Sequence, residues 1–136
     1  MPRRPRRMAC TLTIPAVRAR TKRVTRRRAD TWTDLAVGDR LVLIEKGMGL
    51  KKGEHQVVLD EVEIVDVRVE PIGQILTEAD GTRLEGLDEM DPFEFIVFWL
   101  RHHGHTPPPG AAWDSTTLCR RIEWRYLDDP DGGGPP

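Results

Sequence analysis

The chain lacks the features that mark membrane, secreted and disulfide-rich proteins. No apolar run in its 136 residues approaches the roughly 18 residues that cross a bilayer. The N-terminal stretch MPRRPRRMAC is charged and has no apolar core of a secretory signal. The two cysteines, Cys10 and Cys119, are too few for a disulfide framework, and their spacing matches no metal site. We therefore expect a cytoplasmic protein that uses neither a metal nor another cofactor.

Acidic residues are absent from the beginning of the chain, where the first is Asp30. Ten arginines and Lys22 lie in residues 1–28, whereas the rest of the chain has 10 basic and 22 acidic residues. The net charge of −1 therefore conceals a strong asymmetry. A block this basic predicts contact with a polyanion or with the protein's own acidic half.

Length and composition indicate one globular domain, with 38% apolar and 32% charged residues. We assign the domain to residues 8–127, between a disordered basic arm (1–7) and a disordered, acidic, Gly/Pro-rich tail (128–136). Periodicity and turn residues predict strands at 8–14, 22–27, 40–45, 56–71 and 117–127, a short helix at 15–20, and helices at 76–87 and 91–104. This order predicts an α+β fold: a small, mostly antiparallel β-barrel with two to three helices packed around it.

Two of these segments carry more specific patterns. In the long strand, Val62 and Ile64 share one face, while the apolar residues from Val65 onward follow the opposite parity. Such a switch predicts a bulge near residues 64–65, which is how small barrels bend. The segment 76–87 is expected to begin with Thr77 as its N-cap.

The helix at 91–104 begins with the capping-box pair Asp91 and Glu94. Its predicted core-facing stripe consists of Phe93, Ile96, Val97 and Leu100, and Phe95, Phe98 and Trp99 enlarge the apolar surface beyond that of an ordinary surface helix. The excess is explained either by core packing or by an aromatic wall of a binding site.

The basic stretch RTKRVTRRR at residues 20–28 has the alternation of a half-buried strand. Alternation directs Val24 toward the core and places Arg23, Thr25 and Arg27 on the opposite face. That face is expected to meet something negative, with Arg27 facing a cleft and Arg26 facing away. Charge removal at these two arginines is therefore expected to have unequal effects on binding.

Several motifs, in this order, resemble the ASCH domains of the PUA-like superfamily, particularly bacterial and phage versions. They are K-x-V-T-R-R at Lys22–Arg27, L-x-V-G-D at Leu35–Asp39, G-L-K-K-G-E at Gly49–Glu54, T-E…E-G at Thr77–Gly86 and R-I-E-W at Arg121–Trp124. The resemblance spans residues 8–127. It implies a PUA-like β-barrel whose cleft binds RNA or a modified nucleotide.

The expected ligand-binding residues are four arginines and an aromatic side chain that could stack on a base: Arg20, Arg23, Arg26, Arg27 and Trp32. Trp113 is a second candidate for stacking. The alternative is an amidohydrolase that removes the acetyl group from N(4)-acetylcytidine, as some small bacterial ASCH proteins do. By that resemblance Lys22, Thr25 and Glu85 are the catalytic positions. A third possibility is an accessory protein that binds another protein through its aromatic helix.

The hydrolytic alternative sets a geometric condition. Lys22 and Thr25 are three residues apart, so their side chains would leave opposite faces of a regular strand. They can converge if Lys22 lies in the turn before the strand. We therefore predict that the strand begins at about Arg23 and that Glu85 enters the same cleft.

Overall fold

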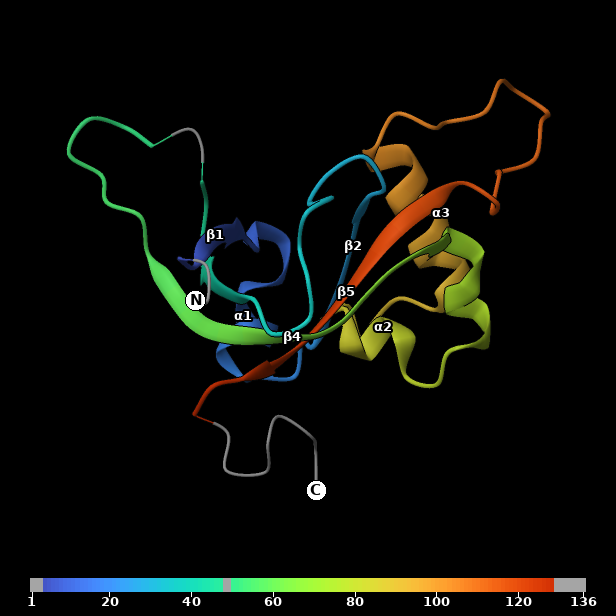
Figure 1. The fold of residues 1–136 in the computed structure, drawn as a ribbon. Helices are drawn as coiled ribbons and strands as arrows, with labels where there is room; N and C mark the ends of the chain where they lie inside the picture. The colour runs from blue at the N-terminus through green and yellow to red at the C-terminus, as the bar shows by residue number, and fades with distance from the viewer. Residues whose placement is uncertain (1–3, 48–49, 129–136) are drawn as a thin grey trace.

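The computed structural model describes residues 4–47 and 50–128. Within these ranges the chain is an α+β protein with one curled five-stranded sheet that forms a half-barrel (Figure 1). The strands are β1 (Arg6–Ala9), β2 (Val24–Arg28), β3 (Arg40–Ile44), β4 (Val58–Pro71) and β5 (Leu118–Tyr126), and the helices are η1 (Thr11–Thr13), α1 (Ile14–Arg18), η2 (Ile72–Thr77), α2 (Gly81–Leu84) and α3 (Pro92–His102). The predicted α+β class and mostly antiparallel sheet are confirmed.

The strand order is β1-β3-β4-β5-β2. β1 is parallel to β3, and the other neighbours are antiparallel. In the described part of the chain β1 and β2 are the two edge strands, and they do not pair with each other. The half-barrel therefore has an open side between β1 and β2.

The curl of the sheet depends on the bulge in β4, which lies where it was predicted. The register with β5 shifts between Ile64 and Asp66, and Val65 has no partner across the strands. Ile64 is buried and Val65 is 40% exposed. Because a bulge bends its strand and increases the local twist, β4 can pair with β3 at one end and wrap with β5 at the other.

The first strand is shorter than predicted. Cys10 N donates to Ile44 O at 2.9 Å, and Thr11 Oγ1 donates to Glu45 O at 2.8 Å. These bonds end the pairing with β3, so residues 11–14, predicted as strand, form η1 and the start of α1. Arg6 and Arg7, which we assigned to the basic arm, belong to the sheet. Residues 1–3 of that arm and 129–136 of the predicted tail lie outside the described residues.

The predicted helix at 76–87 is wrong. Thr77 ends η2 instead of capping a helix, and its hydroxyl donates to Gln74 O at 2.9 Å. Glu78 is extended and Asp80 has a φ of 57°, in the left-handed region. These conformations interrupt the helix and leave α2 with four residues.

Helix α3 has the predicted capping box, in which Glu94 N donates to Asp91 Oδ1 at 2.8 Å and Asp91 N donates to Glu94 Oε1 at 3.3 Å. Its predicted core stripe is partly wrong, because Phe93 is 59% exposed. The buried residues are Phe95, Ile96, Trp99 and Leu100.

The apolar core has two parts. One fills the half-barrel and includes Leu41, Ile64, Ile122 and Trp124. The other lies where η2 and α3 pack near the β5 residue Cys119. Figure 1 shows the two groups of helices at opposite ends of the sheet, with η1 and α1 near β1 and the later helices beside β5. None of the helices in the described ranges has the length and apolar character needed to cross a membrane.

Candidate functional site

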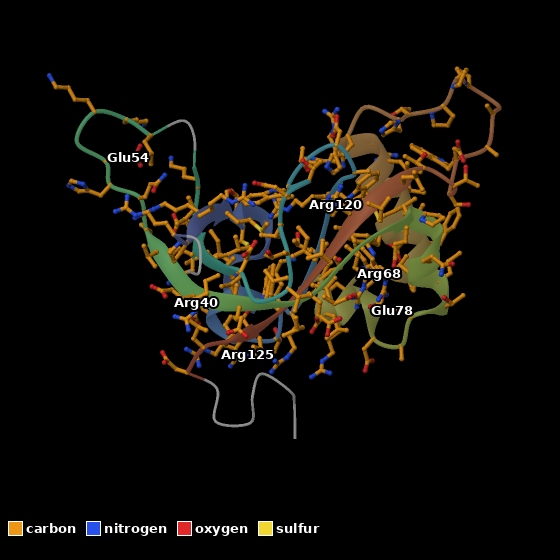
Figure 2. The ribbon with its side chains drawn as sticks, in the orientation of Figure 1. Arg40, Glu54, Arg68, Glu78, Arg120 and Arg125 are labelled. Atoms are coloured by element: carbon orange, nitrogen blue, oxygen red, sulfur yellow. The ribbon has the colours of Figure 1, made fainter. Side chains whose placement is uncertain are left out.

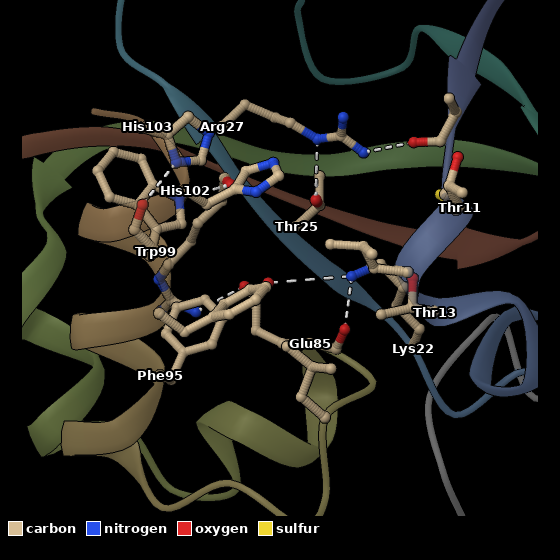
Figure 3. A pocket seen from close by; sticks show the side chains of 16 residues that line it. Thr11, Thr13, Lys22, Thr25, Arg27, Glu85, Phe95, Trp99, His102 and His103 are labelled. Carbon is tan, nitrogen blue, oxygen red and sulfur yellow. Dashed lines mark hydrogen bonds and ion pairs between the residues drawn. The ribbon is translucent and has the colours of Figure 1, made fainter. Parts of the chain in front are cut away.

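A pocket of about 420 Å³ lies on the open side of the half-barrel. Its walls come from the end of β1 and η1, from β2 with the turn before it, from the end of α2, and from α3. The volume lies within the range of about 300–1,000 Å³ that is typical of small-molecule sites. Figure 3 shows the side chains that line it.

Lys22 lies in the turn before β2, which begins at Val24, one residue later than predicted. Its carbonyl oxygen accepts from Trp124 Nε1 at 3.0 Å and from the Tyr126 hydroxyl at 2.5 Å. These two donors from β5 fix the backbone of Lys22. Its side chain is buried and lines the pocket, and Nζ donates to Glu85 O at 2.6 Å.

Thr25 also lines the pocket and is buried. Its hydroxyl oxygen accepts from Arg27 Nε at 3.0 Å, and Arg27 Nη2 donates to Ala9 O at 2.8 Å. Arg27 therefore reaches from one edge strand of the sheet to the other. Because a guanidinium can only donate, the Thr25 hydroxyl hydrogen stays free to be donated elsewhere.

Glu85 reaches the same pocket from the residue that follows α2. One carboxylate oxygen lies 3.9 Å from Lys22 Nζ, and the other accepts from Arg26 Nη1 at 2.8 Å. The next residue, Gly86, has a φ of +86°, and a Cβ there would lie 2.8 Å from the Ala16 Cβ. Glycine thus permits the close approach of α2 to α1 that brings Glu85 beside Lys22.

The pocket changes the acid–base behaviour of Lys22. Burial lowers its pKa below the ordinary value of 10.5, and the nearby Glu85 carboxylate offsets part of this effect. Arg26 and Arg27 lower the pKa further because they disfavour another positive charge. The environment thus favours the neutral amine more than water does.

Helix α3 forms an aromatic wall of the pocket. Phe95, Phe98 and Trp99 line it from successive turns, followed by His102 and His103 at the end of the helix. Trp99 Nε1 donates to Arg26 O at 2.9 Å, which fastens the wall to β2. Core packing explains Phe95 and Trp99, which are buried, and both residues also line the pocket.

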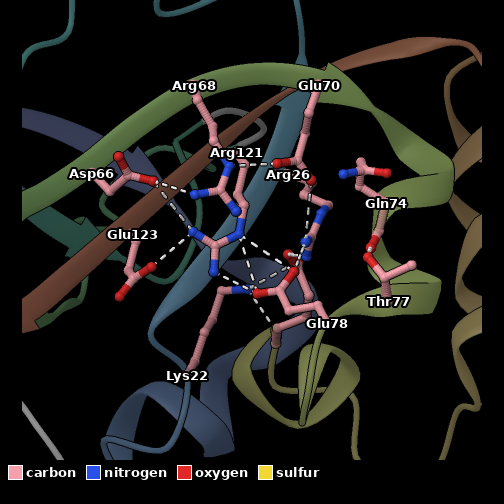
Figure 4. A network of polar contacts seen from close by, with 11 residues as sticks. Lys22, Arg26, Asp66, Arg68, Glu70, Gln74, Thr77, Glu78, Arg121 and Glu123 are labelled. Carbon is pink, nitrogen blue, oxygen red and sulfur yellow. Dashed lines mark hydrogen bonds and ion pairs between the residues drawn. The ribbon is translucent and has the colours of Figure 1, made fainter.

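Arg26 points to the other face of β2, into a buried network of charges (Figure 4). Its side chain is fully buried and contacts the carboxylates of Glu70, Glu78 and Glu85. Carboxylates therefore already match the charge of Arg26.

Glu78 also accepts hydrogen bonds from Arg121. Burial raises the pKa of Glu78, but hydrogen bonds and charge from Arg121 and Arg26 outweigh this effect, and the net shift of the pKa is downward. Figure 2 shows Glu78 and Arg68, another arginine of the network, at the border of the sheet and η2.

Three predicted ligand-binding residues lie outside the pocket lining. Arg20 makes two hydrogen bonds to Asp60, at 2.9 and 3.2 Å. The Arg23 guanidinium lies 6.0 Å from the ring centre of Tyr126. Trp32 packs against the half-barrel core, with Arg6 4.7 Å from its ring centre. The structure thus brings together Lys22, Thr25, Glu85, Arg26 and Arg27, but not Arg20, Arg23 or Trp32.

Sequence reasoning missed the wall opposite α3. It consists of residues 9–13, of which Cys10 and Thr13 are buried and Leu12 is 60% exposed. Strand periodicity gave no indication of this wall, because the segment leaves the sheet at Cys10. Burial raises the pKa of the Cys10 thiol, so this cysteine stays protonated at neutral pH. No group of three or more His, Cys, Asp or Glu side chains within residues 4–47 and 50–128 could hold a metal ion.

Comparison with known proteins finds a similar structure and no similar sequence. No family model matches the sequence, and no curated protein matches it. The structure is similar to the crystal structure of an Enterococcus faecalis protein described under the family model DUF984, with a TM-score of 0.59 and 13% identity over 93% of this chain and 78% of that one. At this identity the likeness concerns the fold alone.

Proposed function

We propose that the pocket binds the modified base of a nucleoside, either free or within RNA. The observation that carries this proposal is that polar side chains and an aromatic wall line the same pocket of about 420 Å³. The polar side chains are those of Lys22, Thr25 and Glu85, which we call the floor of the pocket. Phe98, which is partly exposed on the aromatic wall, offers a face on which a planar base stacks, while Lys22, Thr25 and Glu85 offer donors and acceptors for its polar edge. The resemblance to ASCH domains, with their PUA-like barrels, supports the same class of ligand.

The buried position of the floor favours recognition of a single base over contact with a long run of backbone. Arg20 and Arg26, two of the cations expected to meet phosphate, are already paired with carboxylates. Recognition of RNA in this proposal therefore requires the modified base to leave the stack and enter the pocket, as single-stranded bases do in other RNA-binding modules.

A second candidate function is hydrolysis of an N-acyl group on the exocyclic amine of such a base. It is favoured by one observation: Glu85, which is distant in the chain, lines the same pocket as Lys22 and Thr25. A lysine with a lowered pKa can accept the proton of a hydroxyl nucleophile. Cys10 lines the same pocket, and its raised pKa keeps the thiol protonated. The resemblance to ASCH domains assigns the nucleophile to Thr25.

In this reaction the Thr25 oxygen attacks the acetyl carbonyl carbon while its proton passes to the neutral Lys22 amine. The bond from that carbon to the exocyclic nitrogen then breaks, and the leaving amine takes the proton from Lys22. The acetyl group remains on Thr25 as an ester. A water molecule oriented by Glu85 hydrolyses this ester, which releases acetate and restores the hydroxyl.

The binding proposal is tested by calorimetric titration with N(4)-acetylcytidine. We expect Phe98→Ala to weaken binding by about tenfold, because base–aromatic stacking contributes about 1–3 kcal/mol. Phe93→Ala is the matched control, since Phe93 is 59% exposed on the same helix and does not line the pocket. Equal losses for the two variants, or no binding by the unmodified protein, would contradict the proposal.

The hydrolytic candidate is tested by chromatographic detection of cytidine after incubation with the same compound. Turnover by the wild-type protein that is abolished in Lys22→Ala, Thr25→Ala and Glu85→Ala is the expected result. Binding without turnover would exclude this reaction and leave the binding proposal standing.

A further inference from the structure

The cations that line the pocket differ in how their charge is matched. Arg26 contacts three carboxylates, and Lys22 lies 3.9 Å from Glu85 Oε1. Arg27, in contrast, contacts no carboxylate within residues 4–47 and 50–128, and its hydrogen bonds go to the neutral oxygens of Thr25 and Ala9. Arg27 is therefore a cation in the pocket wall without a matching anion among the described residues.

Arg27 also lies at the mouth of the pocket. Lys22 and Glu85 are each 3% exposed, whereas Arg27 is half-buried and His102 is exposed. Figure 3 shows Arg27, His102 and His103 at one end of the pocket and Lys22 with Glu85 at the other, with Thr25 between them. A ligand whose base occupies the floor thus extends its remaining part toward Arg27.

We infer that Arg27 binds an anionic group of the ligand at the mouth, and that the site selects a nucleoside carrying a phosphate over the nucleoside without one. This inference rests on the proposed function, because it takes the base to lie on the floor. An arginine guanidinium suits a phosphate because its planar donors form charge-assisted hydrogen bonds with the phosphate oxygens. The contacts of Arg27 are with the Thr25 hydroxyl, the Ala9 carbonyl oxygen and the Cys10 thiol, so no carboxylate among the described residues competes with a phosphate for its charge.

The test compares the affinities of N(4)-acetylcytidine and N(4)-acetylcytidine 5′-monophosphate by calorimetric titration. We expect the wild-type protein to bind the monophosphate about tenfold or more tightly, as one charge-assisted contact predicts. Arg27→Gln should remove this preference, and Arg27→Lys should keep part of it because the charge remains. Arg28→Gln is the matched control, since Arg28 is the next residue, is exposed, pairs with Asp30 and does not line the pocket.

A short single-stranded RNA with an internal N(4)-acetylcytidine distinguishes the sources of the phosphate. Tighter binding of this RNA than of the nucleoside, lost in Arg27→Gln, supports a phosphodiester at the mouth. A preference confined to the monophosphate supports a free nucleotide. Equal wild-type affinity for nucleoside, monophosphate and RNA would overturn the inference and leave the proposed function intact. Failure of all three to bind would overturn both.

Thermal melting of the Arg27 variants completes the test. Arg27 links the two edge strands, so Arg27→Gln could alter the fold as well as the charge. A folded Arg27→Lys that prefers the monophosphate supports the inference. A folded Arg27→Gln that prefers the monophosphate as strongly as the wild-type protein does would overturn it.

Discussion

Arg26 and Arg27 show how strongly the surroundings of a residue determine its role. They are adjacent in β2 and chemically identical, yet one lies in a carboxylate network and the other bridges to a backbone oxygen across the pocket. The predicted inequality of the two arginines therefore has a structural basis. We expect Arg26 to contribute to stability, and we propose that Arg27 contributes to ligand selection.

Replacing Arg26 with methionine should strongly destabilise the fold. The change leaves the buried Glu85 carboxylate without its arginine and leaves Glu70 paired with Arg68 alone, and breaking a buried ion pair in this way costs about 3–5 kcal/mol. Arg125→Met is the control, because its pair with Glu63 is partly exposed and should contribute less than about 1 kcal/mol. Urea unfolding measures both. An Arg26→Met protein as stable as Arg125→Met would show that the network contributes nothing.

Lys22 should make the free energy of unfolding depend on pH in a defined direction. Burial lowers its pKa in the folded state below 10.5, so between these two values the unfolded chain binds more protons. Stability contributed by Lys22 therefore rises with pH in that window and reaches its full value above 10.5. Lys22→Met lacks the titrating group and provides the reference.

The measured quantity is the unfolding free energy of the wild type minus that of Lys22→Met, determined in urea at a series of pH values. It should increase toward high pH, by at most about 1.4 kcal/mol per unit. A difference that stays constant or decreases with pH would contradict the lowered pKa.

Among the structural elements, the turn after α2 determines whether the pocket contains its carboxylate. Gly86→Ala adds a methyl group that meets Ala16 Cβ at 2.8 Å and requires a φ of +86°, which alanine adopts at a cost. We expect a loss of about 1–3 kcal/mol in stability and a clear loss of ligand affinity, because α2 must move away and take Glu85 with it.

Gly110→Ala separates these two effects. Gly110 has a φ of +83°, but a Cβ there meets nothing within 4 Å. This control therefore shares the backbone strain without the clash, and we expect it to bind ligand normally. Unfolding and titration of both variants provide the comparison, and equal affinities would show that Glu85 does not depend on the close approach at Gly86.

The elements also show what could be read from the sequence. The capping box of α3 and the bulge of β4 were predictable because each depends on residues a few positions apart. The split of residues 72–84 into η2 and α2 was not, because a local helical pattern does not reveal the left-handed conformation of Asp80. The parallel pairing of β1 with β3 likewise depends on residues about 35 positions apart, beyond the reach of periodicity.

The candidate site likewise has features that the sequence indicated and features that it did not. The resemblance selected Lys22, Thr25 and Glu85, and all three line one pocket. Strand alternation placed Arg27 on the pocket side, but it also grouped Arg23 with Arg27, whereas Arg23 precedes the strand and lies near Tyr126. The burial of Arg26 was not predictable from β2, because the carboxylates that surround it come from residues 70–85.

For the molecule as a whole, we expect the bulge at Val65 to influence how far the half-barrel closes. Deleting Val65 restores regular alternation, since Val62, Ile64 and Val67 then share one face, but it removes the bend. We expect a folded protein with a straighter β4, a wider separation of β1 from β2, and ligand binding at least about tenfold weaker.

Val65→Ala retains the bulge and is the control for the lost side chain. Its affinity should match that of the wild type, because Val65 is 40% exposed and does not line the pocket. Circular dichroism and calorimetric titration test the pair. Normal affinity in the deletion variant would mean that the opening does not depend on the curl.

The pairing of β2 with β5 has a consequence for how the protein folds. Val24 pairs with Glu123, about a hundred residues later, so the contact has high sequence separation, and such contacts slow folding. During synthesis β2 leaves the ribosome long before its partner exists. We expect the cations of residues 20–28 to oppose aggregation of this unpaired strand, as charge on edge strands does. In this view the arginine-rich stretch has a role in the unfolded chain that is distinct from the contacts that Arg26 and Arg27 make in the folded protein.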